Sequence, residues 1–423
     1  MKNLTLRLLT GMVLIAGSMT GFAATMDITA SFSPSMESPE SNTFTNTTPK
    51  SGYCASFPVQ CALNKTFSIA MGGITASLTT SGITANSEAR MGMYFKMPGG
   101  WRDVIVTNTA NGNTATTGFR VNAFSSRYIT LTNWSRELHQ ATWRGSSFVE
   151  APSPCSYSGV GGLPDYGYLF MWKWPASDSA CYKTALRDLT GEPYLIDSTS
   201  LGYELKTPNP LMMEAGIYTG TLTLSIGPGG NIDFGDNFQA SDSELVINFT
   251  LTVNHELKLT TTADNHKVSL QPCASGRICT EDDGLANWER WMITRVTPQL
   301  TGRSNFNLSS SGAFTVYLSC EQQSGSDCAL RSDRNPSQRV PVQTLLTLAD
   351  NVVDSATGMQ ISKRRLAMGK DVANNVFLTQ VFGQNKTGSI DFLIDQRDVD
   401  TMLENRPDTY RGAVTVIFDP KIY

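Results

Sequence analysis

The sequence lacks the short motifs that mark many enzymes, and it has few of the residues that build metal sites. It contains no Gly-x-Ser-x-Gly nucleophile turn, no Gly-x-x-x-x-Gly-Lys phosphate loop and no His-Glu-x-x-His zinc helix. Only 3 histidines occur in 423 residues, and no two cysteines have the Cys-x-x-Cys spacing. Charged residues make up 17% of the chain, and the formal net charge is −4. We therefore expect no catalytic residue, no metal, no cofactor and no nucleic-acid partner.

Long apolar runs are absent after the first residues of the chain. The early apolar stretch from Leu8 to Ala16 follows Lys2 and Arg7, and the small residues of Gly21-Phe22-Ala23 come after it. This is the pattern of a secretory signal peptide. No later segment approaches the roughly 20 apolar residues of a membrane span. The sequence thus predicts a signal peptide at residues 1–23 and an exported protein.

The cysteines fall into four pairs that are close in sequence: Cys54 and Cys61, Cys155 and Cys181, Cys273 and Cys279, and Cys320 and Cys328. Local disulfides formed in an oxidising compartment are the simplest explanation of this spacing. A zinc site is the competing interpretation. The shortage of histidine and of Cys-x-x-Cys spacing disfavours it.

The remaining composition is typical of β-sandwiches. The chain has 35 Gly, 19 Pro and many Ser and Thr, and short alternating runs such as Phe119-Val121-Ala123 dominate over helical periodicity. Its length favours two domains. The alternation from Leu245 to Val253 continues into Leu257 and Leu259 without Gly or Pro, which places a border near Asn254. We predict an all-β protein with two immunoglobulin-like β-sandwich domains, at residues 24–254 and 255–423. The segment 25–49, rich in Ser, Thr and Pro, shows no long alternating run.

A Tyr-x-Gly motif followed by an alternating strand occurs at Tyr218 and again at Tyr410. In immunoglobulin-like sandwiches a tyrosine near the start of strand F bonds back to the corner, so each motif predicts a strand F. After Tyr218 there is room for strand G, whereas only thirteen residues follow Tyr410. We therefore expect the second sandwich to lack its last strand. Its open groove would be lined in part by Val414, Val416 and Phe418, and a strand from another protein would fill it. Alternatively, these three residues belong to a sandwich closed by a strand from elsewhere in the chain.

Basic residues are concentrated within the otherwise acidic first domain. Between Arg90 and Arg144 there are seven basic and two acidic residues, with three tryptophans among them. Guanidinium groups beside aromatic faces suit a sugar that carries a carboxylate or sulfate. The candidate receptor-binding residues are Arg102, Arg120, Arg127, Arg144 and Trp134. Alternatively, the arginines are solvated strand positions and the tryptophans are core residues.

Two acidic patches raise the question of calcium binding. They are Asp233 with Asp236, and Glu281-Asp282-Asp283-Gly284. Neither matches the spacing of the twelve-residue EF-hand loop. We therefore interpret both patches as turns.

Several segments resemble the colonization-factor type of fimbrial tip adhesin, which is assembled by the alternate (alpha, or class 5) chaperone-usher pathway. In the second domain the resemblance runs through Val342-Gln343-Thr344-Leu345-Leu346-Thr347-Leu348, Gly358-Met359-Gln360-Ile361, Thr387-Gly388-Ser389-Ile390-Asp391-Phe392 and Tyr410-Arg411-Gly412-Ala413-Val414-Thr415-Val416-Ile417-Phe418. In the first domain it runs from Cys155 through Gly216-Ile217-Tyr218-Thr219-Gly220 to Val253. Residues 25–150 have no match.

The resemblance implies a receptor-binding first domain and a pilin-like second domain. It also implies three assembly partners: a periplasmic chaperone that lends a strand, an outer-membrane usher, and a major fimbrial subunit whose N-terminal extension replaces the chaperone strand. The protein would be exported through the periplasm to the fimbrial tip at the cell surface. There it would initiate assembly and bind a host-surface glycan or glycoprotein.

The resemblance fails at one receptor-binding feature. Members that recognise sialylated receptors have a neighbouring arginine pair just after the strand equivalent to Thr221–Ile226, where this sequence has Gly227-Pro228-Gly229-Gly230. The resemblance therefore does not imply that this chain recognises sialylated receptors. The rival interpretations are a non-adhesive fimbrial adaptor or minor pilin, and a secreted carbohydrate-active enzyme.

Overall fold

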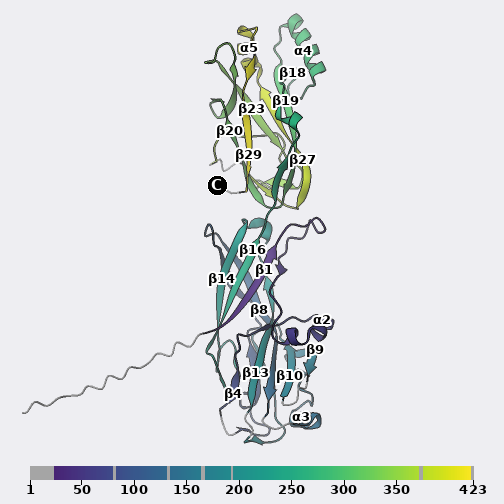
Figure 1. Cartoon of the computed structure of the whole chain (residues 1–423), viewed down its shortest axis with the longest axis vertical. Coiled ribbons are helices and arrows are strands. Elements are labelled where there is room, and N and C mark those ends of the chain that lie inside the picture. The colour runs from purple at the N-terminus through teal and green to yellow at the C-terminus, as the bar shows by residue number, and fades with distance from the viewer. Residues whose placement is uncertain are drawn as a thin grey trace, which may run out of the picture.

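The computed structural model describes residues 23–79, 82–130, 134–162, 167–191, 194–370 and 375–420. The predicted signal peptide, residues 1–23, lies outside this part except for Ala23. Within these ranges no helix combines the length and the apolar character that crossing a bilayer requires. The prediction of an all-β protein with two sandwich domains is confirmed. Figure 1 shows the two domains stacked end to end along the long axis.

The first domain is built around one large curled sheet with the strand order β15-β4-β13-β8-β7-β14-β16-β1-β2. Its buried core is rich in aromatic side chains, among them Phe95, Phe124 and Trp172. The elements are β1 (Ala24–Phe32), β2 (Thr45–Asn46), α1 (Tyr53–Ser56), α2 (Pro58–Leu63), β3 (Ile69–Ala70), β4 (Ala76–Leu78), β5 (Gly82–Ile83), η1 (Ala89–Met91), β6 (Met93–Met97), β7 (Arg102–Asn108), β8 (Thr114–Ile129), α3 (Arg136–Thr142), β9 (Ser156–Gly162), β10 (Gly167–Lys173), β11 (Ser179–Lys183), β12 (Leu189–Thr190), β13 (Leu195–Lys206), η2 (Pro210–Met212), β14 (Gly216–Ser225), β15 (Phe238–Ala240) and β16 (Glu244–Val253).

The second domain has two sheets that enclose a separate apolar core. One sheet has the main order β17-β19-β27-β23-β22-β21, and the other has the order β24-β26-β20-β29. The elements are β17 (Leu257–Thr260), η3 (Ala263–His266), β18 (Gln271–Cys273), α4 (Glu281–Thr294), β19 (Gln299–Ser310), β20 (Ala313–Cys320), β21 (Gln323–Ser324), β22 (Asp327–Ser332), β23 (Arg339–Thr347), β24 (Val352–Asp354), β25 (Arg364–Arg365), β26 (Val376–Thr379), β27 (Gly383–Ile394), α5 (Gln396–Glu404), β28 (Tyr410–Arg411) and β29 (Val414–Asp419).

The strand order identifies which position of the second sandwich is empty. In an immunoglobulin-like sandwich, strands A, B, E and D form one sheet and strands C, F and G form the other. The order β17-β19-β27-β23 corresponds to A-B-E-D, and β20-β29 corresponds to C-F. In the first domain β16 pairs with the equivalent strand, β14, along its whole length. In the second domain, no strand of the described ranges pairs with the outer edge of β29.

The structure corrects the expectation for the N-terminal segment. Ala24–Phe32 forms β1, a strand of nine residues in which Met26, Ile28, Ala30 and Phe32 are buried while the intervening residues face outward. It pairs in parallel with β16, with Ile28 opposite Phe249. The alternation of these buried residues was hidden in the sequence by the many Ser, Thr and Pro residues between positions 25 and 49. The segment therefore completes the first domain.

The structure also corrects the interpretation of Glu281-Asp282-Asp283 as a turn. These residues form the first turn of α4, where carboxylates stabilise the N-terminal end of the helix. The Thr280 hydroxyl accepts a hydrogen bond from the Asp283 amide at 3.3 Å, and the Asp283 carboxylate accepts one from the Thr280 amide at 3.2 Å. This reciprocal capping box was visible in the sequence as Thr-x-x-Asp.

Candidate functional site

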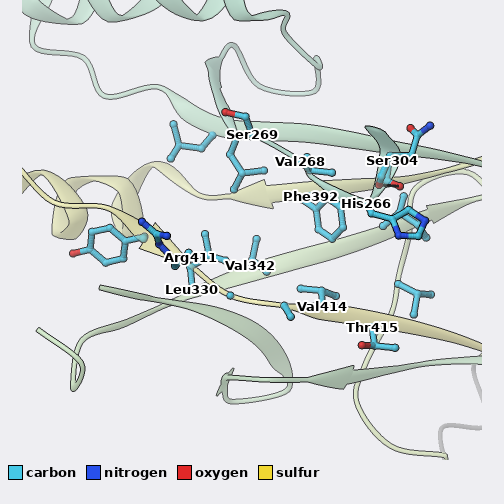
Figure 2. Close-up of a pocket in the computed structure, with 18 of the residues that line it drawn as sticks. His266, Val268, Ser269, Ser304, Leu330, Val342, Phe392, Arg411, Val414 and Thr415 are labelled. Carbon is cyan, nitrogen blue, oxygen red and sulfur yellow. Dashed lines mark hydrogen bonds between the residues drawn. The ribbon is translucent and has the colours of Figure 1, made fainter. Parts of the chain in front are cut away.

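The second domain contains a groove between the edges of its two sheets. One wall is β29 with the residues just before it, and the other runs from Leu259 of β17 through His266 to Leu270. Its volume is about 720 Å³. Figure 2 shows Val268 and Ser269 on one side of the groove, and Val414 and Thr415 on the other. The first wall is an edge strand, because β29 ends its sheet, whereas the second wall begins at the edge strand β17 and continues through η3 and the segment that leads to β18.

The floor of the groove is apolar and belongs to the core. Leu300 and Phe306 of β19 and Ile390 of β27 line it and are at most 7% exposed. Phe392 and Val342 also lie along the floor in Figure 2. An extended peptide could bury its apolar side chains against this floor while pairing its backbone with an edge strand.

The three groove residues expected from the sequence lie together on β29. Val414, Val416 and Phe418 all line the groove and are only partly buried, although they pack against the core. They lie opposite Cys320, Leu318 and Val316 of β20. Sequence reasoning missed the facing wall, although the alternation of Val268 and Leu270 could have revealed it.

Charged groups at the rim of the groove already have partners. Arg411 pairs with Asp333 at 2.7 Å. The Ser332 hydroxyl donates a hydrogen bond to Asp408, and this bond, with those from nearby backbone amides, lowers the pKa of the Asp408 carboxyl. Because these charges are compensated locally, the groove offers shape and apolar surface more than a charge for recognition.

The structure places three of the candidate receptor-binding arginines beside acidic residues. Each of three arginines is paired with a carboxylate: Arg102 with Asp178 at 2.8 Å, Arg120 with Glu204 at 2.7 Å and Arg127 with Asp197 at 2.6 Å. Arg120 and Arg127 lie directly opposite their partners on β13. The Arg102 guanidinium lowers the pKa of the Asp178 carboxyl. These arginines stabilise neighbouring segments by cross-strand and loop pairing, which sequence spacing could not reveal.

Trp134 is also not available as a sugar platform, since its side chain is 5% exposed and packs in the core. The exposed guanidinium of Arg187 lies 5.1 Å from the centroid of its ring. Arg144, the remaining candidate, is exposed and donates a hydrogen bond to the Asn86 side chain at 2.9 Å. Arg144 and Arg187 flank the backbone bridge between Trp143 and Ala185, near α3. Figure 1 places α3 at the end of the molecule farthest from the second domain.

The eight cysteines form four disulfides, in the pairs expected from their spacing: Cys54–Cys61, Cys155–Cys181, Cys273–Cys279 and Cys320–Cys328. Cys320–Cys328 joins β20 to β22, next to the start of β29. Cys273–Cys279 closes the loop that leads from β18 into α4.

Asp233 and Asp236 serve a structural purpose that the sequence did not reveal. Arg90 reaches both carboxylates, at 2.9 Å and 2.6 Å. Asp233 is fully buried and also accepts hydrogen bonds from the amides of Gly229 and Gly235. The described residues contain no cluster of His, Cys, Asp and Glu suited to a metal ion.

Several solved structures match the chain over nearly its whole length. One is from a study of the chaperone–tip adhesin complex in CFA/I fimbriae biogenesis, with 10% identity, 95% of this chain and 97% of that chain covered, and a TM-score of 0.24. Another is CfaE, the adhesive subunit of CFA/I fimbria of enterotoxigenic Escherichia coli, with 8% identity, 94% and 93% covered, and a TM-score of 0.22. A third is the CsuC–CsuE chaperone–tip adhesion subunit complex from the archaic Csu pili of Acinetobacter baumannii, with 12% identity, 94% and 99% covered, and a TM-score of 0.21. No protein-family model and no curated protein matches the chain.

Proposed function

We propose that this chain is a fimbrial tip adhesin and assembly initiator, and not an enzyme. Residues 24–254 bind a host-surface glycan or glycoprotein, and residues 255–423 join the chain to the fibre. The observation that carries this proposal is the groove between β17 and β29, with an apolar floor and an unpaired strand edge. A periplasmic chaperone first fills the groove. The N-terminal extension of the major fimbrial subunit then replaces the chaperone strand at the outer-membrane usher.

Physical chemistry favours an occupied groove over an empty one. An unpaired strand edge leaves backbone donors and acceptors open to aggregation. Each Val, Leu or Ile side chain that a donor strand buries contributes about 1.5–3 kcal/mol. The six residues of β29 span roughly 20 Å, which accommodates three inward-facing side chains of a paired strand.

A charge placed in the groove tests this assignment. Val416→Glu puts a carboxylate where donor side chains would pack, so we expect no soluble complex when the variant is co-expressed with the chaperone. The matched control is Ile105→Glu, because Ile105 is 66% exposed on a strand of the first domain. Normal recovery of Val416→Glu with the chaperone would count against the groove as the acceptor site.

The receptor-binding surface belongs, in this proposal, to the outer end of the first domain. Arg144 and Arg187 are exposed there, and Arg136 begins the adjacent α3. Exposed guanidinium groups suit the carboxylate or sulfate of an acidic sugar. This end lies opposite the α4 and α5 end of the second domain in Figure 1, so receptor and fibre would not compete for space.

The receptor surface can be tested without disturbing the fold. We expect Arg144→Ala with Arg187→Ala to weaken binding to host cells about tenfold while fibres assemble normally. Arg339→Ala, an exposed position in the second domain, is the control. Arg120 and Arg127 are unsuitable, because their removal leaves Glu204 and Asp197 without their ion-pair partners. Unchanged adherence of the double variant would show that Arg144 and Arg187 do not bind the receptor. Loss of adherence in the control variant alone would also contradict the proposed receptor surface.

A further inference from the structure

Helix α4, Glu281–Thr294, leaves apolar side chains in contact with water. Its inner side holds the buried Gly284 and the partly buried Trp288, which packs against the core of the second domain. Its outer side carries Leu285, Met292 and Ile293, which are 63%, 55% and 85% exposed, and Val296 just beyond the helix is 69% exposed. We call these four residues the α4 apolar face.

Three members of the α4 apolar face lie on the outer side of the helix. Leu285 and Met292 are seven residues apart, which places them on the same side two turns apart, and Ile293 lies about 100° further round the helix. Isolated exposed apolar residues are common on soluble proteins. Three on α4 and Val296 just after it give four exposed apolar residues within twelve, a concentration typical of interaction sites.

The helix stands at one end of the groove. Leu270 lines the groove, and two residues later the carbonyl of Pro272 accepts a hydrogen bond from the Asn287 side chain of α4 at 2.9 Å. On the other side, the Arg406 guanidinium lies 5.4 Å from the centroid of the Trp291 ring, and so links α4 to the segment that leads into Tyr410 and the groove. Figure 1 shows α4 and α5 together at the end of the second domain that faces away from the first domain.

The first domain lies beside the other end of the groove. Phe418 is paired with Val316, near the start of β20, and β20 follows the Ser311–Gly312 turn at the domain junction. A strand that pairs antiparallel with β29, as strand G does with strand F, therefore runs from the junction toward α4. When that strand is an N-terminal extension, the folded body of its own protein follows it at the α4 end.

We propose that the α4 apolar face is the docking surface for the folded body of the major fimbrial subunit whose extension fills the groove. This inference rests on the proposed function, and it adds a second contact to the inserted strand. Direct continuity of strand and body holds the body close to α4, so that little further ordering entropy is lost when the apolar surfaces meet. The exposed Arg290 borders these apolar side chains, and the exposed Glu289 places a charge between Leu285 and Ile293.

The test compares two probes on the complete chain. One is a synthetic peptide with the N-terminal extension of the major fimbrial subunit, and the other is that complete subunit. We expect the subunit to dissociate about tenfold more slowly than the peptide. Leu285→Glu and Ile293→Glu, made separately and together, should remove this difference without changing peptide dissociation. Met359→Glu is the control, because Met359 is 70% exposed elsewhere in the same domain.

Each outcome decides one of the two proposals. Failure of the peptide to bind the wild-type chain would overturn the proposed function, and with it this inference. If the peptide binds but the subunit dissociates from the wild type and from the α4 variants at the same rate, only the docking surface is overturned. Loss of chaperone binding in the α4 variants, with subunit dissociation unchanged, would assign the face to the chaperone. Wild-type dimers in light scattering that the variants abolish would assign it to a second copy of the chain. Both results would overturn the docking proposal.

Discussion

At the residue scale, His139 is a buried titratable group in an aromatic environment. Its side chain is 1% exposed, and its Nδ1 shares a hydrogen bond of 2.6 Å with the Tyr128 hydroxyl. The Tyr128 oxygen also accepts a hydrogen bond from Trp143 Nε1 at 3.2 Å. Among the described residues, Nε2 of His139 has no hydrogen-bond partner. Burial favours the neutral imidazole and lowers the pKa of His139 from 6.5 to about 4.

This pKa predicts a loss of stability in mild acid. Below pH 6.5 the unfolded chain binds a proton at His139 that the folded chain refuses until about pH 4, so the free energy of unfolding falls across this interval. The full loss is about 3 kcal/mol. Thermal unfolding is measured at pH 7.5 and at pH 4.5. The melting temperature of His139→Gln should fall less between these two pH values than that of the wild type. His266→Gln, at an exposed position, serves as the control and should retain the wild-type decrease. Equal decreases in all three proteins would contradict the role given to His139.

The residue scale also shows where prediction from sequence reaches its limit. The cysteine pairs are separated by at most 26 residues, so local spacing was sufficient to suggest them. Arg120 and Glu204 are 84 residues apart and meet only because β8 and β13 pair in one register. A count of basic residues between Arg90 and Arg144 cannot detect such partners.

At the element scale, alternation predicted the strands that carry a long regular pattern. The run from Leu245 to Val253 and the Val414, Val416 and Phe418 pattern of β29 were read correctly as strands because every second residue faces apolar surface. Helix α4 was missed, since its outward side is apolar and hides the usual separation of polar and apolar faces. Its capping box was the usable signal.

The capping box gives a prediction for α4. Thr280→Ala removes the side-chain acceptor of the Asp283 amide and should destabilise the helix by about 1 kcal/mol. We expect faster hydrogen exchange at the first-turn amides of α4, with little change in the melting temperature of the whole chain. Thr280→Ser restores the acceptor and should restore protection. Unaltered exchange in Thr280→Ala would show that the disulfide Cys273–Cys279 holds the helix start without the cap.

At the scale of the whole molecule, the two domains meet through a short and well-packed junction. His255 Nε2 donates a hydrogen bond to the Met213 carbonyl at 2.8 Å, and its Nδ1 shares one of 3.3 Å with the Ser311 hydroxyl. A second link joins the Phe382 amide to the Pro39 carbonyl at 3.2 Å. These contacts connect the two domains at two places, and they favour a fixed angle between the domains.

Gly312 gives a prediction for this junction. A Cβ atom there would lie 2.6–2.8 Å from the His255 ring, so Gly312→Ala should displace the ring and loosen the junction. Small-angle scattering should report a broader range of interdomain distances, while the melting temperatures of the two domains remain close to wild type. Gly162→Ala is the control, since no atom lies within 4 Å of its added Cβ. An unchanged scattering profile for Gly312→Ala would show that the His255 contacts do not set the interdomain angle.

The most direct test of the account is calorimetric unfolding of the complete exported chain, with and without a peptide carrying the N-terminal extension of the major fimbrial subunit. The peptide should bind the folded second domain and not the unfolded one. At saturating concentration it should therefore raise the melting temperature of that domain by about 10 °C. The first domain and a scrambled peptide should show no shift. A second domain that is stable and indifferent to the peptide would mean that its sandwich needs no strand from another protein, and this would contradict the central claim.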